Sequence, residues 1–408
     1  MDDEGVNMKK VSITRFYFVC FIINSMSCVI LPVTPTIFKN INFPDYMFGV
    51  SFAAMAAGMF LFSPYWGRLG DRVGHTNALI LSCVGYCIGQ ILFGVSRTVW
   101  LTILVRFFTG FFSAGTMVSF MSYVADSGEG EKQKAKYMSY YSAVLSVSNA
   151  AGYFLGGVIG SASIFYAFVF QIAGVIFSCV YAWICLEDPV NVKVRFSGAK
   201  SLNPFEALKD IKEIASVSFI MILTAVFLAA FGTFAFDNTL SYFLRAELDF
   251  PASYNGYIKA AVGIIGLLAN FTINMFIIEK TNIRISIIYV LFMCGITALI
   301  LYFVRGNALF VIITLIHFTF NSIYMPIIQV LATKADENIP VGSISGVFNS
   351  IRSLGMFLGS MAVGFIYVLD SRIPFIAVAA AFLSGSFVCM ANYMYYGKQK
   401  SIEQNKLY

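Results

Sequence analysis

Twelve long apolar segments constrain this chain more than any other feature of its sequence. Of its 408 residues, 59% are hydrophobic and 12% are charged, whereas about 25% of the residues in a soluble domain are charged. A membrane-spanning helix needs roughly 20 mostly apolar residues. We predict such helices at residues 13–35, 46–66, 77–95, 99–123, 138–159, 165–186, 216–240, 256–278, 285–304, 308–332, 344–369 and 374–396. The chain is therefore predicted to be an all-α membrane protein in contact with the lipid bilayer.

Positively charged residues fall mostly on one side of these predicted spans. If both termini are cytoplasmic, the other side holds only a few of the 27 Lys and Arg residues, namely Lys39, Arg97, Arg245, Arg305 and Arg372. Cytoplasmic loops carry an excess of Lys and Arg, so this bias predicts a multi-pass protein of the cell membrane with both ends inside. Because the net charge of +6 is spread over many short loops, we expect no nucleic-acid partner.

The cysteine residues indicate neither a metal centre nor a redox motif. All eight lie inside predicted spans, and none forms a Cys-x-x-Cys pair: Cys20, Cys28, Cys83, Cys87, Cys179, Cys185, Cys294 and Cys389. Small buried or lipid-facing cysteines are common in apolar helices. We therefore expect no metal and no cofactor.

The chain divides into two halves of six spans each. Its longest polar stretch between spans lies in residues 187–215, which we interpret as a cytoplasmic linker between bundles at 1–186 and 216–408. The segment "GYFLGG" at 152–157 recurs as "GMFLGS" at 355–360, and an Ala-Asp pair follows the fourth span of each half. Duplicated bundles are a recurring plan of transporters, with the substrate site between the halves. Chance similarity between glycine-rich helices is the alternative interpretation.

The stretch "GRLGDRVGHT" at 67–76 joins the second and third spans. It resembles the loop signature of the major facilitator superfamily, Gly-x-Leu-Ala-Asp-Arg-x-Gly-Arg-Lys. The matching residues are Gly67, Leu69, Asp71, Arg72 and Gly74, whereas His75 and Thr76 depart at the basic end. Glycines permit a tight turn between helices. The resemblance implies that Gly67, Asp71, Arg72 and Gly74 form a lock that holds in one conformational state and releases in the other. The alternative is an ordinary charged loop.

A second motif lies in the fourth span. The stretch "RFFTGFFSAG" resembles the Arg-x-x-Gln-Gly motif of proton-coupled members of this superfamily. Arg106 and Gly110 match it, and Thr109 stands in the place of Gln. A charged residue inside an apolar span usually faces a cavity or a partner, so Arg106 is a candidate for proton coupling.

A third motif lies in the fifth span. The stretch "NAAGYFLGGVIG" resembles the antiporter motif Gly-Pro-x-x-Gly-Gly. Gly152, Gly156 and Gly157 match, but Tyr153 replaces the proline, so the kink of that motif is lost. We expect the three glycines to allow close packing between helices.

The resemblance runs along nearly the whole chain. It is strongest to the twelve-span drug:proton antiporter family, which includes multidrug efflux pumps of Gram-positive bacteria. In the seventh span, Asp237 occupies the place of a membrane acid in those pumps. In the tenth span, Asn321 stands where some relatives carry a second acid, and in the eleventh span Asn349 matches while Arg352 is extra.

Asp237 is the only carboxylate that we place inside a predicted span. It is the candidate proton carrier, because burial favours the protonated form of a carboxyl group. Arg106 and Arg352 are its expected regulators, and a structural ion pair with either one is the alternative. Lys259 is expected near the outer end of the eighth span, with its amine reaching towards water.

Polar residues on the first, fifth, tenth and eleventh spans are candidates for substrate binding, because these spans line the cavity in the family. They are Asn24, Ser146, Asn149, His317, Asn321, Tyr324 and Asn349. Contacts between helices are the alternative role for each, because a buried polar group needs a partner. For His317, a proton relay and a structural role both remain open.

The sequence predicts a secondary active transporter, not an enzyme. We expect proton-coupled export of amphipathic neutral or cationic compounds by a monomer, with small molecules and protons as its partners. One alternative is a carrier of the same fold for a single metabolite, such as a siderophore, sugar or lipid. A membrane receptor without transport is a further alternative, but the tails and the central loop are too short for a signalling domain.

Overall fold

The computed structural model describes residues 13–128, 130–188, 216–333 and 341–406, and these residues form helices with short connections. The first half contains α1 (Ile13–Val29), η1 (Leu31–Val33), α2 (Thr34–Asn40), α3 (Met47–Val73), α4 (His75–Val95), α5 (Val99–Asp126), α6 (Gly130–Ala162) and α7 (Ile164–Cys185). The second half contains α9 (Val217–Ala246), α10 (Ala252–Ala269), η3 (Asn270–Asn274), α11 (Met275–Lys280), α12 (Ile283–Phe303), α13 (Asn307–Thr333), α14 (Val341–Leu369) and α15 (Ile373–Lys406).

The predicted set of twelve apolar helices is confirmed in this part of the chain. Two spans are interrupted. The first runs from Ile13 to Asn40 as α1, η1 and α2, with Pro32 and Pro35 at the breaks, because proline cannot donate the backbone hydrogen bond of a helix interior. The eighth passes through the five-residue π-helix η3 between α10 and α11.

The stretch from Gly67 to Thr76 is less of a loop than its glycines predict. Helix α3 continues through "GRLGDRV" to Val73, and α4 begins at His75. The whole change of direction falls on Gly74, whose φ of +93° lies in the region that side chains other than glycine rarely adopt. The predicted loop was therefore too long, because only one glycine is needed for this turn.

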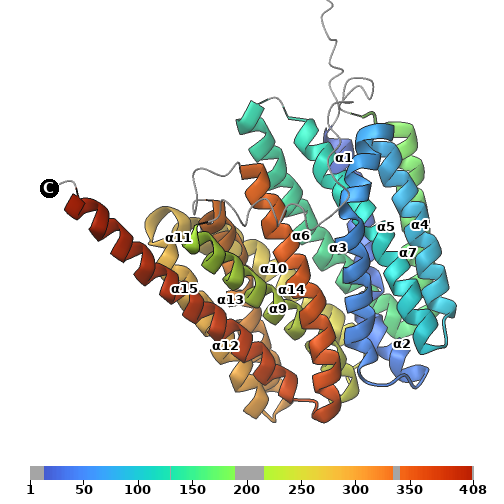
Figure 1. Ribbon diagram of the computed structural model, residues 1–408. Helices are drawn as coiled ribbons and strands as arrows, with labels where there is room; N and C mark the ends of the chain where they lie inside the picture. The colour runs from blue at the N-terminus through green and yellow to red at the C-terminus, as the bar shows by residue number, and fades with distance from the viewer. Residues whose placement is uncertain (1–12, 129, 189–215, 334–340, 407–408) are drawn as a thin grey trace, which may run out of the picture.

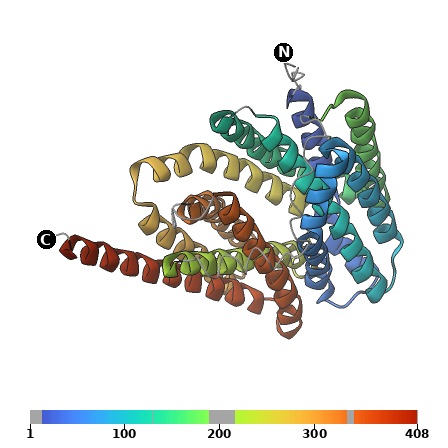
Figure 2. The same cartoon turned by 45° about the horizontal axis from the view of Figure 1, so that its top comes forward.

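The helices form two bundles that lie side by side (Figures 1 and 2). In the first bundle α1 packs on α6 and α7, and α5 packs on α3 and α4. In the second, α9 packs on α14 and α15, and α12 on α13 and α15. The two-bundle fold agrees with the prediction. Most of the predicted linker, at 189–215, lies outside the described residues.

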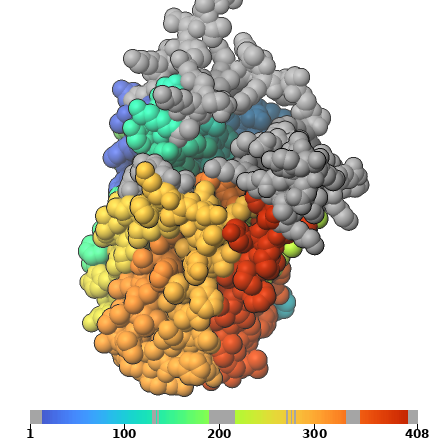
Figure 3. Space-filling view, turned by 90° about the vertical axis from the view of Figure 1, so that its left-hand side faces the viewer, coloured from blue at the N-terminus to red at the C-terminus, as the bar shows by residue number. Residues whose placement is uncertain are grey.

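The surface of the bundles is apolar where the helices face outward. Figure 3 looks on to the outer face of the second half, formed by helices coloured from yellow to red. Large side chains of this half are well exposed, among them Tyr289, Phe303, Ile312 and Phe387. Such a surface suits a lipid environment, in which apolar side chains face the hydrocarbon.

The halves meet along two pairs of helices, α3 with α14 and α6 with α10. Glycines allow the close approach. A Cβ on Gly49 of α3 would meet the backbone of Gly364 at 2.7 Å, and a Cβ on Gly157 of α6 would meet that of Gly256 at 2.8 Å. These contacts lie towards residues 41–46, 247–251 and 370–372, which together form what we call the closed end. In Figure 1, α3 and α14 lie together at this lower end and diverge towards the upper end.

Candidate transport site

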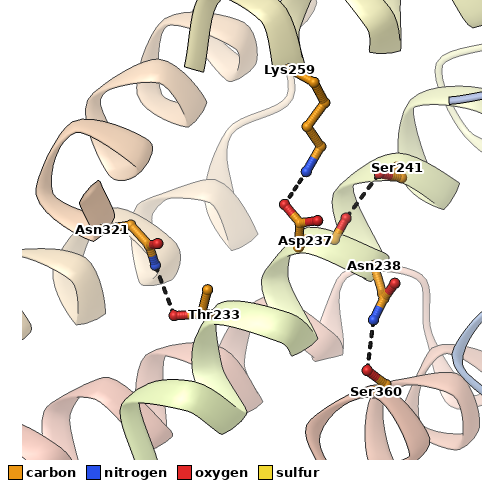
Figure 4. A network of polar contacts seen from close by, with 7 residues as sticks. All are labelled: Thr233, Asp237, Asn238, Ser241, Lys259, Asn321 and Ser360. Carbon is orange, nitrogen blue, oxygen red and sulfur yellow. Dashed lines mark hydrogen bonds and ion pairs between the residues drawn. The ribbon is translucent and has the colours of Figure 1, made fainter. Parts of the chain in front are cut away.

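Asp237 and Lys259 form an ion pair between two helices of the second half. Asp237 lies more than two turns before the end of α9, and Lys259 lies about two turns after the start of α10. Nζ of Lys259 donates a hydrogen bond to Oδ1 of Asp237 (Figure 4). The Asp237 side chain is 34% exposed, whereas that of Lys259 is 3% exposed.

This geometry corrects the prediction that Lys259 reaches outward to water. The predicted eighth span began at residue 256, which placed Lys259 on its first turn. Helix α10 instead begins at Ala252, so Lys259 is carried deeper and buried. A buried charge needs a partner. A signal for this pair was present in the sequence, because Lys259 is the only cation in the eighth predicted span and Asp237 is the only acid in any predicted span.

The pair faces the first half of the molecule. Lys259 Nζ lies 5.8 Å from the centre of the Tyr153 ring on α6 and 4.9 Å from that of Phe318 on α13. Tyr153 and Cys28 of α1 both lie close enough to Asp237 to be influenced by its charge. The residue that replaces proline in the antiporter-like motif therefore contacts the charged pair across the interface between the halves.

Neither arginine forms the ion pair with Asp237 that the sequence suggested, among the described residues. Arg106 is buried within the first half, where Nη2 lies 3.4 Å from Thr34 Oγ1 and the guanidinium lies 3.6 Å from the centre of the Phe93 ring. The Arg352 guanidinium lies 5.6 Å from the ring of Phe234. The surroundings of each charged residue depend on helices that are far apart in sequence. The sequence alone therefore did not identify Lys259 as the partner of Asp237.

Two candidate substrate residues of the first half form one polar cluster. Asn24 Nδ2 on α1 donates to Ser148 Oγ and to Asn149 Oδ1 on α6, each at 2.7 Å. Cys28 Sγ lies 3.2 Å from the same Asn149 oxygen. Ser146 instead bonds to the carbonyl of Ser142 within its own helix, at 3.0 Å.

A cavity of about 220 Å³ adjoins this cluster. It is lined mainly by apolar and sulfur-containing side chains, including Cys28, Met55, Met59, Met117 and Phe120, with Asn24 as a polar group in its wall. Flexible methionines and aromatic rings suit apolar ligands of varied shape. Cys28, which lines this cavity, is also close enough to Asp237 for its thiol to be influenced by the charge of that carboxylate.

Two candidates of the second half form a matching cluster. Thr233 Oγ1 of α9 accepts a hydrogen bond of 3.1 Å from Asn321 Nδ2 of α13 (Figure 4). The same oxygen lies 2.8 Å from the hydroxyl of Tyr324, also on α13. Next along α9, Asn238 Nδ2 donates to Ser360 Oγ of α14 at 2.8 Å. Asn349 is exposed on α14. Thr233 was not predicted, although it lies one turn before Asp237.

His317, another candidate for substrate binding, lies apart from this polar cluster among the helices of the second half. Its side chain is fully buried and stacks on Phe236, with ring centres 3.8 Å apart. Nδ1 lies 2.9 Å from Thr297 Oγ1 of α12. The structural role left open by the sequence fits this position, because the ring packs among the helices of the second half.

The "GRLGDRVGHT" stretch packs against two acidic residues of its own half. His75 Nε2 lies 2.9 Å from Asp126 Oδ2 at the end of α5, and the backbone N–H of Thr76 donates to Asp188 Oδ1 at 2.9 Å. Asp71 and Arg72 are exposed on the last turn of α3. His75 and Thr76, which depart from the family signature, thus make defined contacts at the start of α4.

The small residues of α6 serve two interfaces. A Cβ on Gly152 or Gly156 would strike the backbone of α1, at Ser25 and Val29 respectively, whereas one on Gly157 would meet α10 of the other half. Two of the three glycines therefore bring helices of one half together, and the third lies at the boundary between the halves.

A group of residues at the closed end was missed by the sequence analysis. The Tyr242 hydroxyl of α9 donates to Asp45 Oδ1 of the first half at 2.6 Å, and the Tyr242 ring stacks on Phe48 of α3 at 4.6 Å. Lys39 Nζ lies 3.1 Å from Asp249 Oδ1, which adds an exposed ion pair across the same boundary. Polar residues at helix ends carry no sequence signal that distinguishes a contact between halves from an ordinary loop.

These features define a class of protein. Two six-helix membrane bundles meet beside a charged pair, one bundle carries an apolar cavity, and contacts at one end join the two. This arrangement is that of a secondary transporter, whose substrate site lies near the midplane between two halves.

Comparison with known proteins gives the family. The sequence model of the Major Facilitator Superfamily matches residues 16–360, so this chain belongs to that superfamily. It is 24% identical to Multidrug resistance protein 2 of Bacillus subtilis, over 88% of this chain and 89% of the relative. It is 23% identical to Quinolone resistance protein NorA of Staphylococcus aureus, over 95% of this chain and 98% of the relative. The protein is therefore a transporter and not an enzyme.

Solved structures show the same fold at low sequence identity. The nucleoside transporter NupG aligns with a TM-score of 0.73 at 12% identity, covering 93% of this chain and 98% of that one. The human organic anion transporter MFSD10 aligns with a TM-score of 0.67 at 16% identity, covering 94% and 99%. Their shared fold extends over almost the whole length of each chain.

Proposed function

We propose that this transporter is a proton-coupled exporter of amphipathic compounds, with Asp237 and Lys259 at its coupling site. The observation that carries the proposal is this ion pair, buried on the Lys259 side and accessible on the Asp237 side, at the boundary between the halves. Proton relays in transporters are built from ionisable groups inside the membrane. The multidrug and quinolone resistance proteins to which the chain is similar favour export of toxic compounds.

The transporter lies in the cell membrane with both termini in the cytoplasm, as the excess of Lys and Arg on one side indicates. In this orientation the closed end faces outward. The described structure then corresponds to the state that takes up substrate from the cytoplasm. Transport proceeds as the halves, 1–186 and 216–408, rock against each other around the coupling site, so that the contacts of the closed end break as the opposite end closes.

The substrate lies between the two polar clusters and the cavity. Asn24 and Asn149 contribute polar groups from the first half, and Asn321 and Tyr324 from the second. The methionines and aromatic rings of the cavity hold the apolar part of the compound. Loose specificity follows, because flexible apolar side chains repack around ligands of different shape.

Uphill transport in vesicles tests this function. The purified protein is reconstituted into liposomes, and uptake of the fluorescent cation ethidium is followed while a pH gradient is imposed. We expect accumulation against the ethidium gradient in wild type, collapse when a protonophore removes the pH gradient, and no accumulation with Asp237→Asn. Wild-type vesicles that equilibrate ethidium and a panel of neutral drugs without ever concentrating them would refute proton-coupled export.

A further inference from the structure

We propose that the exchanged proton leaves from the Lys259 amine, at the moment when a cationic substrate takes the place of Lys259 on Asp237. This inference rests on the proposed function and names its substrate charge and its proton donor. The inference depends on a difference between the two side chains, because Asp237 is accessible to a ligand and Lys259 is not.

Only the acidic member of the pair is accessible to a ligand. The Asp237 side chain is 34% exposed, whereas Lys259 is 3% exposed beneath Phe318 and Tyr153. An anion would have to reach the enclosed amine, but a cation can approach the exposed carboxylate directly. The accessible charge of the pair is therefore negative, and it selects a positively charged ligand.

Two further charged residues, Arg106 and Arg352, lie within the described spans, and neither changes the preference of this site for a positively charged ligand. Arg106 is buried against Phe93 and Thr34 within the first half. Arg352 lies beside the ring of Phe234. Both are guanidinium groups, which keep their protons at all relevant pH values and so cannot supply the exchanged proton.

Loss of its partner makes the charged form of Lys259 unfavourable. A buried ammonium with no counter-ion is strongly penalised, and lysine can relieve this penalty by releasing its proton. The other titratable groups near the pair are Tyr153 of α6 and Cys28 of α1, and both residue types are neutral at pH 7 at their ordinary pKa values. Neither one can replace Asp237 as a counter-ion.

The exchange balances in atoms and charge. A substrate cation binds the Asp237 carboxylate, one N–H bond of Lys259 breaks, the electron pair stays on Nζ, and the proton passes to water. After the halves change position, the cation leaves, Lys259 takes a proton from the other side, and the pair forms again. One monovalent cation is exported for each proton that enters, so the exchange moves no net charge.

The body of the cation has a place next to this carboxylate. Cys28 lies within the influence of the Asp237 charge, and it lines the cavity formed with Met55, Met59 and Phe120. An aromatic or alkyl cation can thus set its charge at Asp237 and its apolar groups in the cavity, where aromatic rings also attract cations.

The test uses two probes of nearly the same shape and opposite charge, tetraphenylphosphonium and tetraphenylborate. Neither probe carries a titratable proton, so any proton released on binding comes from the protein. Purified wild-type protein in a weakly buffered detergent solution with a pH indicator is titrated with each probe near pH 7.5. We expect tetraphenylphosphonium to release close to one proton per bound cation, and tetraphenylborate to bind at least tenfold more weakly. Equal or tighter binding of tetraphenylborate would overturn the substrate charge.

Two variants identify the proton donor. Lys259→Arg keeps the positive charge but cannot lose its proton, so tetraphenylphosphonium should bind at least tenfold more weakly and release no proton. Lys259→Gln leaves Asp237 without a competitor, so the cation should bind as tightly as to wild type or more tightly, again without proton release. If either folded variant releases protons as wild type does, the donor is another group and the inference fails.

Failure of the inference is distinguishable from failure of the proposed function. If wild-type vesicles concentrate ethidium under a pH gradient and Lys259→Arg does so equally well, export is proton-coupled but Lys259 is not the donor. If wild-type vesicles never concentrate any compound, the proposed function itself is wrong. Asp237→Asn is the matched control, because it should lose binding of tetraphenylphosphonium in either case.

Discussion

The hydroxyl of Tyr242 donates a hydrogen bond of 2.6 Å to Asp45 Oδ1, and this bond joins the two halves of the transporter at the closed end. Phe48, three residues after Asp45, stacks on the Tyr242 ring. The neighbouring Tyr367 hydroxyl of α14 donates to Glu247 Oε1 at 3.2 Å. A bond to a charged acceptor contributes about 1.5–3 kcal/mol, so this contact alone is large enough to bias the equilibrium between two transport states.

Tyr242→Phe should weaken closure of this end. The substitution removes the hydroxyl but keeps the ring on Phe48, and the expected loss of about 1.5 kcal/mol corresponds to roughly a tenfold shift towards the state that is open there. Distances between spin labels at exposed residues Asn42 and Asp370 would report the shift. Tyr46→Phe is the control, because Tyr46 contributes a ring contact with Phe365 at this end. Unchanged distance distributions in Tyr242→Phe would show that the bond does not hold the halves together.

Gly256→Ala should disfavour the same closed state by a steric effect. A Cβ on Gly256 would lie 2.6 Å from the backbone oxygen of Tyr153 and 2.7 Å from Cα of Gly157, so α6 and α10 must move apart. We expect a shift of about fivefold to a hundredfold towards opening and slower export, because misfit between packed backbones typically costs about 1–3 kcal/mol.

The matched control for that substitution is Gly385→Ala on α15. A Cβ there would meet its nearest neighbour at an ordinary 3.7 Å, so state populations and export should stay at wild-type values. Solvent accessibility of single cysteines placed along α10, measured by maleimide labelling, would compare the two variants. Equal labelling of Gly256→Ala and wild type would contradict the steric argument.

Gly74→Ala should destabilise the turn between α3 and α4. Its φ of +93° is strained for a residue with a side chain, and its Cβ would collide with the carboxylate of Asp188. The strain is of order 1–3 kcal/mol, so the midpoint of thermal unfolding in detergent should fall by several degrees. Gly67→Ala, in the same motif, would place its Cβ 3.8 Å from Val118 and should unfold like wild type. A Gly74→Ala variant as stable as Gly67→Ala would show that the turn relaxes freely.

Arg106→Gln should leave the pH dependence of export unchanged. Arg106 packs on Phe93 and Thr34 and forms no ion pair with Asp237 in the described part of the chain. This expectation reverses the sequence-based one, in which Arg106 regulated the protonation of Asp237. Initial rates of ethidium export from vesicles between pH 6 and 8.5, compared between Arg106→Gln and wild type, would test this expectation. A displaced midpoint in Arg106→Gln, at normal protein levels, would restore Arg106 to the coupling site.

The charged residues show where sequence-based reasoning stops. Asp237 was identifiable because it is a lone carboxylate in a long apolar segment, and an apolar environment makes such a residue costly and therefore functional. Its partner was not identifiable in the same way. Arg106, Lys259 and Arg352 all lie in spans, and only the packing of α9 against α10 places Lys259 next to it.

The polar clusters show the same limit. Asn24 and Asn149 were both expected to line the cavity, but their hydrogen bond to each other depends on the packing of α1 on α6. Histidine is a residue type that can relay protons, but the His317 side chain is buried in the core of its own bundle and stacks on Phe236. A position along a helix does not specify the direction that its side chain faces within a bundle of six.

The sequence by itself determined that this chain is a twelve-helix membrane protein, because the bilayer requires long apolar helices. It also predicted that the two halves are related, from motifs repeated at equivalent positions. It also determined the family, through the "GRLGDRVGHT" stretch. Only the tertiary structure decided that Lys259 binds Asp237, that Tyr242 holds Asp45, and that Gly157 lies against Gly256. These contacts join residues of different helices, and the free energy of each depends on distances of a few ångströms between segments whose relative positions no local pattern encodes.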